Sequence, residues 1–192
     1  MSYYITMNLN ISQIKTLMLT PLSDADIKRY LPNTPIIKYE ELSNFDSIEE
    51  LLPKAKSSVI ILAEQRESVG HWFSVFRNNN NICYFDPFGY RVDKALLFTP
   101  IYLRRGLGQK IPFLSHLLNQ ALDNGFIVSF NQHDYQNRDD TAISTCGRHC
   151  VNRIRFNNQS IDFRPEDYFR YMNGLAKKLN ESFDAVVCRL VP

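Results

Sequence analysis

Apolar residues form short runs through the middle of the chain. Residues 58–63 (SVIILA) are continuously apolar, which is typical of a buried strand. Residues 71–76 and 82–85 have the alternation of two further strands, and the Asn-rich segment 78–81 between them suits a tight turn, because Asn tolerates positive φ better than most residues. Residues 126–130 form another candidate strand. These runs predict a sheet in the middle of the chain.

Helical signals precede this region and also occur within it. Residues 23–26 and 47–50 resemble capping boxes at the starts of helices, within an N-terminal part that otherwise reads as loop. Residues 112–122 predict an amphipathic helix that ends at Asn124-Gly125. The residues expected on its apolar face are Leu114, Leu117, Leu118 and Ala121.

The C-terminal third contains two further helical stretches. The chain turns helical from Cys146, and Pro165 is suited to the first turn of a second helix. A final apolar run, residues 185–191, predicts a closing strand. The inward-facing residues expected on the two helices are Gly147, Cys150, Val151 and Ile154, then Tyr168, Met172, Leu175 and Leu179.

Strands in the middle with helices on both sides predict an α+β domain, with a central, mostly antiparallel sheet flanked by helices. No repeat or long linker interrupts the 192 residues. We expect a single domain over 1–192: a helical N-terminal part (1–57), a core (58–156), and a C-terminal helix and strand (157–192).

Composition narrows the class of protein. Hydrophobic residues make up 44% and charged residues 22% of the chain, which is ordinary for a globular domain. The net charge of +2 argues against a dedicated nucleic-acid binder, and no apolar run approaches the ~20 residues of a membrane span. Because the first residues lack a secretory signal, we expect a reducing compartment and free thiols at all four cysteines, with Cys83 and Cys188 as core residues.

Three residues carry the candidate chemistry: His71, Asp86 and Cys146. If the strands around residues 78–79 pair so that partner numbers sum to 157, His71 lies opposite Asp86. Facing residues have Cβ atoms about 4.5–5.5 Å apart, within hydrogen-bonding reach of an imidazole and a carboxylate. Asp86 then fixes the tautomer of His71 that presents its other nitrogen to a thiol. The alternatives are a surface histidine at a strand end and a turn residue before Pro87.

Cys146 is the favoured nucleophile because it stands where a helix begins. Ser144 or Thr145 can cap this helix, and the positive end of its dipole favours a thiolate. Cys150, one turn later, is the competing cysteine, but it lies on the apolar stripe. Gly147 leaves room for a substrate backbone.

An oxyanion donor is also expected. The backbone N–H of Cys146 is one candidate, and the side-chain amide of Gln132 or Gln136 is the other. Gln136 is nearer in sequence and is preferred.

The segments GHWFSVF, CYFDPFG, the Gln-bearing loop and TCGRHC, in that order, resemble the adenain-like and ubiquitin-like-protein-specific cysteine proteases. YFDPFG is closer to the adenovirus endopeptidase style, and TCGRHC resembles virophage (mavirus-like) and Maverick/polinton maturation proteases. The resemblance covers about residues 59–156.

The resemblance implies a papain-like fold and cleavage of viral capsid or other structural precursors at Gly-rich or small-residue sites. Position by position, it implies Cys146 as nucleophile, His71 as base, Asp86 as its orienter and Gln136 as oxyanion donor. Trp72 matches the tryptophan that narrows the substrate groove; a core aromatic is the alternative.

These readings lead to further expectations. The protein is expected to need no cofactor or metal, to act as a monomer on a protein substrate without a membrane partner, and to have at most a weak nucleic-acid activator. Its expected location is the host cytoplasm, at the viral factory, and the virion.

Two other functions are weighed against a viral maturation protease. The first keeps the chemistry but makes the protein an isopeptidase that removes ubiquitin-like modifiers. The second is a zinc-binding interaction module built from Cys146, His149 and Cys150 with His133. Three ligands within one helical turn cannot easily supply a tetrahedral site, which argues against zinc.

Overall fold

The computed structural model describes residues 7–66, 69–159 and 164–192 as an α+β fold built on one five-stranded sheet. The strands lie in sequence order, β1-β2-β3-β4-β5. The two central junctions are antiparallel, whereas β1 pairs with β2 and β4 pairs with β5 in parallel. The bounds are β1 Ile36–Lys38, β2 Ser58–Arg66, β3 Val69–Asn78, β4 Asn81–Phe85 and β5 Ile127–Phe130.

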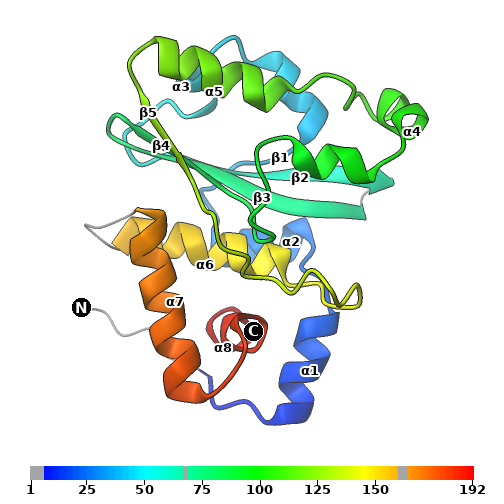
Figure 1. The fold of residues 1–192 in the computed structure, drawn as a ribbon, viewed down its shortest axis with the longest axis vertical. Coiled ribbons are helices and arrows are strands. Elements are labelled where there is room, and N and C mark those ends of the chain that lie inside the picture. Colours follow the sequence, from blue (N-terminus) through cyan, green and yellow to red (C-terminus); the bar gives the residue numbers. More distant parts are fainter. Residues whose placement is uncertain (1–6, 67–68, 160–163) are drawn as a thin grey trace.

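Helices cover both faces of this sheet (Figure 1). On one side lie η1 Tyr39–Asn44, α3 Ile48–Leu51, η2 Lys94–Phe98, α4 Ile101–Gly106 and α5 Phe113–Asp123. On the other lie α2 Asp24–Tyr30, α6 Cys146–Gln159 and α7 Pro165–Leu179. Beyond α6 in Figure 1, α1 Ile11–Leu19 and α8 Phe183–Leu190 lie farthest from the sheet.

The alternation of side chains along the strands gives the sheet an apolar core on each face. Phe73 and Val75 of β3 belong to the core shared with α5 and η2. Trp72 and Phe76 of the same strand belong to the core shared with α6, α7 and α8. The predicted apolar face of α5 is confirmed, because Leu114, Leu117, Leu118 and Ala121 are all buried.

The hairpin of β3 and β4 is confirmed, but its predicted register is wrong by two residues. Ser74 pairs with Phe85 and Asn78 with Asn81, so partner numbers sum to 159 rather than 157. The reason is a turn centred on residues 79 and 80, in which Asn79 takes a positive φ of 54°. A shift of two residues leaves every side chain on its predicted face, because the side-chain period of a strand is two.

The predicted C-terminal strand is also wrong. Residues 183–190 form helix α8, whose N-cap Ser182 accepts a hydrogen bond from the backbone N–H of Ala185 at 3.2 Å. The apolar run looks like a strand because α8 is buried on nearly every side; Ala185, Val186, Val187, Cys188 and Leu190 are all buried. Buried helices and buried strands share this pattern.

The N-terminal part is mixed rather than only helix and loop. Ser23 and Asp26 form the predicted capping box. Ser47 caps α3, but Glu50 bonds the backbone N–H of Asp46 in place of that of Ser47. The short strand β1 was not predicted. Over the part of the chain that the structure describes, no helix has the length and apolarity to cross a membrane.

Candidate active site

The structure brings His71 and Asp86 together in a buried pair. His71 lies on β3, and Asp86 follows the last residue of β4. The Nε2 atom of His71 lies 3.0 Å from Oδ1 of Asp86, and their exposed fractions are 6% and 0%. Because Nε2 faces the carboxylate, Nδ1 is the ring nitrogen left for another partner.

Besides His71, two neighbours hold the Asp86 carboxylate in place. The hydroxyl of Tyr84 donates to Oδ2 at 3.1 Å, and the backbone N–H of Phe88 donates to Oδ1 at 2.8 Å. The Phe88 ring stacks on the His71 imidazole with centroids 4.6 Å apart. Sequence reasoning missed both residues, although Tyr84 shares a strand face with Asp86 by simple alternation.

Asn131 fixes the backbone of Asp86. Its Oδ1 accepts from the Asp86 N–H at 2.9 Å, and its Nδ2 donates to the Asp86 carbonyl at 2.7 Å. The same Nδ2 donates to the carbonyl of His133, which ties the following loop to the site. Asn131 is buried just after β5, and nothing in the sequence pattern singled it out.

Cys146 is the second partner of the imidazole. Burial lowers the pKa of His71, but the charge and hydrogen bond of Asp86 and a hydrogen bond with Cys146 outweigh it and raise the pKa to about 10. The imidazole is therefore protonated at neutral pH, between a carboxylate and a thiol.

The local setting distinguishes Cys146 from Cys150. Cys146 is the first residue of α6, where the backbone N–H groups have no partner within the helix, and 8% of it stays exposed. Cys150 is inaccessible, and burial together with the charges of Cys146 and Asp86 raises its pKa well above the ordinary value. All four cysteines are free.

The loop before α6 places Gln136, but not Gln132, in the interior. Gln136 is 4% exposed, and Gln132 is exposed. The backbone N–H of Gln136 donates to the carbonyl of Pro87 at 2.9 Å, next to Asp86. Its Nε2 donates to the carbonyl of Ile143 at 2.7 Å, close to the start of α6. One N–H of that amide remains for another acceptor.

Trp72 and Gly147 pack against each other. Trp72 is 6% exposed, and its Nε1 donates to the carbonyl of Leu22 at 3.3 Å. A Cβ on Gly147 would lie 3.3 Å from Cδ1 of Trp72 and 3.2 Å from Cβ of Leu22. The space that Gly147 leaves is thus taken by the protein core, and substrate contacts for both residues stay a prediction.

A second buried carboxylate ties the start of α6 to α8. Asp184 accepts hydrogen bonds from the hydroxyl of Thr145 and, at 3.0 Å, from the backbone N–H of Asn137. Its Oδ1 also lies 3.4 Å from Nε2 of His149. Burial alone would raise the pKa of Asp184. The hydrogen bond and the charge of His149 outweigh burial, so the pKa lies below its ordinary value. The Ser144 hydroxyl donates to the carbonyl of Ala142 and the Thr145 hydroxyl donates to Asp184, and a cap of α6 by either residue stays a prediction.

The ligands imagined for zinc do not gather in one place. His149 faces Asp184, and His133 stacks on Phe169 with ring centroids 3.7 Å apart. Within residues 7–66, 69–159 and 164–192, no group of three or more His, Cys, Asp or Glu side chains could hold a metal ion. The zinc-module reading gains no support from this geometry.

Fold and site together define an α+β protein with a Cys–His–Asp constellation at the junction of a sheet and a helix start. The chain is 32% identical over 142 residues to "Uncharacterized protein V9" of Sputnik virophage, an alignment that covers 73% of this chain and 78% of V9. The chain therefore belongs to the same protein family as V9. No protein-family model matches the sequence.

Solved structures with a related arrangement are distant. The C-terminal Ulp1 protease domain bound to Smt3, the yeast orthologue of SUMO, has a TM-score of 0.41 at 14% identity, covering 98% of this chain and 86% of that one. Ulp1 with its catalytic cysteine oxidised to a sulfenic acid has a TM-score of 0.44 at 14% identity, covering 97% and 96%. ChlaDub1 from Chlamydia trachomatis has a TM-score of 0.32 at 15% identity, covering 91% and 80%.

Proposed function

We propose that the chain is a cysteine peptidase in which Cys146 is the nucleophile and His71 is the general acid and base. The observation that carries this proposal is the buried His71 imidazole, which Asp86 holds through Nε2 at 3.0 Å and whose pKa is raised by Asp86 first and by Cys146 second. A thiol, an imidazole and an orienting carboxylate in this order are the parts of a nucleophilic acyl-transfer site.

The reaction follows from these positions. The Cys146 sulfur attacks a carbonyl carbon, and the imidazolium of His71 gives its proton to the leaving amine. His71 then takes a proton from water as the water oxygen attacks the thioester. The acid is released, and the Cys146 thiolate and the His71 imidazolium are restored. Gln136 and the backbone N–H at the start of α6 are the proposed donors to the oxyanion, which typically contribute about 10²–10³ in rate each.

For the substrate we propose viral capsid or other structural precursors, cut at Gly-rich or small-residue sites during particle maturation. Family membership with a virophage protein supports a viral setting. The near-closed site supports small residues next to the cut, since His71 and Cys146 keep only 6% and 8% of their surfaces.

The test is co-expression of the protein with the structural proteins encoded in the same genome, followed by mass spectrometry of new termini. New termini should appear with the wild type and with Cys150→Ala, and should vanish with Cys146→Ala and His71→Ala. Ubiquitin-like fusion proteins form a parallel arm. Cleavage of the fusions alone would show that the isopeptidase reading is right, and activity in Cys146→Ala would overturn the mechanism.

A further inference from the structure

Exposed apolar side chains concentrate on η2, α4 and the loop that follows. We call these residues the η2–α4 surface: Leu97, Phe98, Ile101, Tyr102, Leu103 and Ile111, which are 41–69% exposed. Helix α4 has no buried residue. Large apolar side chains that gather on one surface usually mark a binding site.

The same segment concentrates positive charge. Residues 90–112 contain five basic residues and one acidic residue, a net charge of +4, whereas the whole chain carries +2 and the remainder therefore −2. The basic residues are Arg91, Lys94, Arg104, Arg105 and Lys110. Among the described residues none of the five forms an ion pair. The acidic residue, Asp93, accepts hydrogen bonds from Tyr39 and Ser115.

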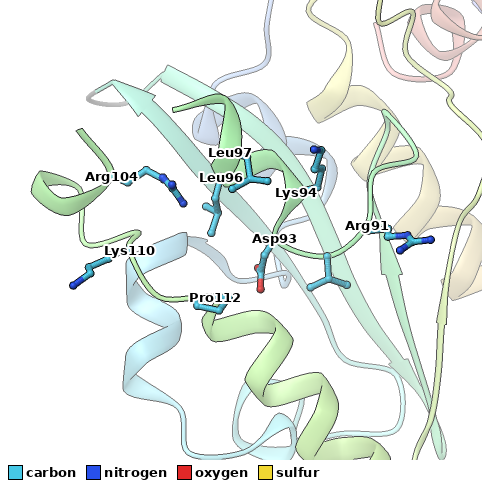
Figure 2. Close-up of a pocket in the computed structure, with 9 residues that line it drawn as sticks. Arg91, Asp93, Lys94, Leu96, Leu97, Arg104, Lys110 and Pro112 are labelled. Carbon is cyan, nitrogen blue, oxygen red and sulfur yellow. The ribbon is translucent and has the colours of Figure 1, made fainter. Parts of the chain in front are cut away.

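A hollow of about 370 Å³ joins the two features. Figure 2 shows Leu96 and Leu97 beside Arg104, with Lys110 and Pro112 on the same side and Arg91 on the other. Burial leaves Nε of Arg104 without a hydrogen-bond partner among the described residues. The hollow thus offers apolar contacts together with four cations that form no ion pair within the described part of the chain. Asp93 also lines it, but the carboxylate of Asp93 accepts hydrogen bonds from Tyr39 and Ser115.

A row of aromatic rings connects this surface to the candidate active site. The His71 imidazole stacks on Phe88, whose ring centroid is 5.4 Å from that of Tyr90. Tyr90 in turn lies 5.1 Å from Phe98, which is half exposed on the η2–α4 surface. A polypeptide bound at the surface can therefore continue over these rings toward Cys146.

We propose that the η2–α4 surface binds an acidic segment of the polypeptide substrate, one that mixes carboxylate and large apolar side chains. The proposal rests on the proposed peptidase function and adds a recognition site outside the catalytic residues. Carboxylates complement the unpaired cations, and apolar side chains complement Phe98, Ile101 and Tyr102. The ring connection to His71 favours a substrate segment over a lipid surface or a nucleic acid, neither of which would need to reach the thiol.

Binding is measured with the full chain carrying Cys146→Ala, so that the result does not depend on turnover. The probe is a fluorescein-labelled peptide that mixes Asp and Glu with Leu and Phe, compared with the same peptide in which Lys replaces each acidic residue. The acidic peptide should bind at least tenfold more tightly by fluorescence anisotropy, and rising salt should weaken it. Equal binding of the two peptides would overturn the proposal.

Surface variants locate the site. Arg104→Glu and Tyr102→Ser should each weaken binding of the acidic peptide at least fivefold, with Lys110→Glu as a second charge reversal if Arg104→Glu fails to fold. The controls are Lys177→Glu on α7, which repeats the Lys-to-Glu reversal elsewhere, and Ile127→Ser on β5, which replaces another exposed apolar side chain by Ser. Equal losses in the controls would contradict a localised site.

Two further arms separate the alternatives. Tighter binding to vesicles of phosphatidylserine and phosphatidylcholine, or to a 20-nucleotide DNA, than to the acidic peptide would overturn the proposal in favour of those partners. In the active enzyme, joining the acidic segment to a cleavable substrate should lower KM in the wild type but not in Arg104→Glu. If the protein binds the acidic peptide but cleaves no substrate, the binding site would be supported and the proposed peptidase function would be contradicted.

Discussion

The imidazole of His71 is shaped by neighbours that belong to different segments of the chain. Asp86 supplies the charge that most strongly raises the pKa of His71 against the effect of burial. Tyr84 and Phe88 hold that carboxylate, and Asn131 holds its backbone. Without these contacts the carboxylate could turn away from the ring, and burial alone would keep the imidazole neutral.

The first prediction concerns pH. Because the pKa of His71 is raised to about 10, the imidazolium and the stability that it contributes are fully present below about 6.5 and are lost as pH rises through about 10. The alkaline limb of kcat/KM should therefore lie near pH 10. Asp86→Asn removes the charge, so this limb should move to lower pH and kcat/KM at pH 7 should fall roughly 10²-fold or more. The measurement is a pH–rate profile with a fluorogenic peptide; identical profiles would exclude the role of Asp86.

Gly147 provides a test at the scale of a single methyl group. A Cβ there would press on Trp72 and Leu22, so Gly147→Ala should push the start of α6 away from β3 and slow the reaction of Cys146 with iodoacetamide. The control is Gly174→Ala in α7, where nothing lies within 4 Å of the added atom. That change should stabilise the protein by about 0.5–1 kcal/mol and leave alkylation unchanged. Equal alkylation rates in both variants would contradict the packing argument.

At the scale of elements, the sequence predicted best where one face of an element is buried and the other is solvated. The helix 113–123 is an example, because Leu114, Leu117, Leu118 and Ala121 are buried on one face only. Helix α8 was mistaken for a strand because its burial on nearly all sides erases the helical period. The strand β1 escaped notice because three residues contain too little pattern to read.

The contact between His71 and Asp86 was predicted from a hairpin register that is wrong, but the error did not change which side chains share a face. The hairpin register was wrong by two residues, yet His71 and Asp86 stay on one strand face because two residues are one side-chain period. By contrast, Asn131 and Asp184 could not be foreseen, since their roles depend on loops and helices that meet only in the folded chain.

Asp184 is the contact through which α8 positions the start of α6. It bonds Thr145, which precedes the proposed nucleophile Cys146, and Asn137, which follows the proposed oxyanion donor Gln136. Asp184→Ala should leave buried donors unpaired, and a loss of about 3 kcal/mol in the free energy of unfolding is expected. The folded fraction of Asp184→Ala should have a lower kcat than the wild type with little change in KM. Asp184→Asn should have a kcat between those two values. Glu181→Ala, which removes a more exposed ion pair with Arg189, should cost about 1 kcal/mol or less and leave kcat unchanged.

In the described part of the chain, two large apolar cores share one sheet, and a smaller cluster lies between α1 and α8. One core joins the sheet to α5, and the other joins it to α6, α7 and α8. The N-terminal helix α1 packs on α8 through Ile14, Ala185 and Cys188, so the two ends of the described chain support the same side. The buried Arg148 strengthens this side by donating to the carbonyls of Thr20 and Val191.

Trp72 provides a test of whether the chain unfolds as one cooperative unit, because it is the only tryptophan and lies in the core that contains α6. If 1–192 is a single domain, both cores lose their packing together, since each of the strands β1 to β4 contributes side chains to both. Unfolding in urea should then give the same midpoint by Trp72 fluorescence, which reports one core, and by far-UV circular dichroism, which reports all elements. A fluorescence transition at clearly lower urea would mean that α6, α7 and α8 leave the sheet while α5 still covers it. In that case Cys146, the proposed nucleophile, would belong to a group of helices that unfolds separately from the sheet that carries His71. The single-domain prediction would then be wrong.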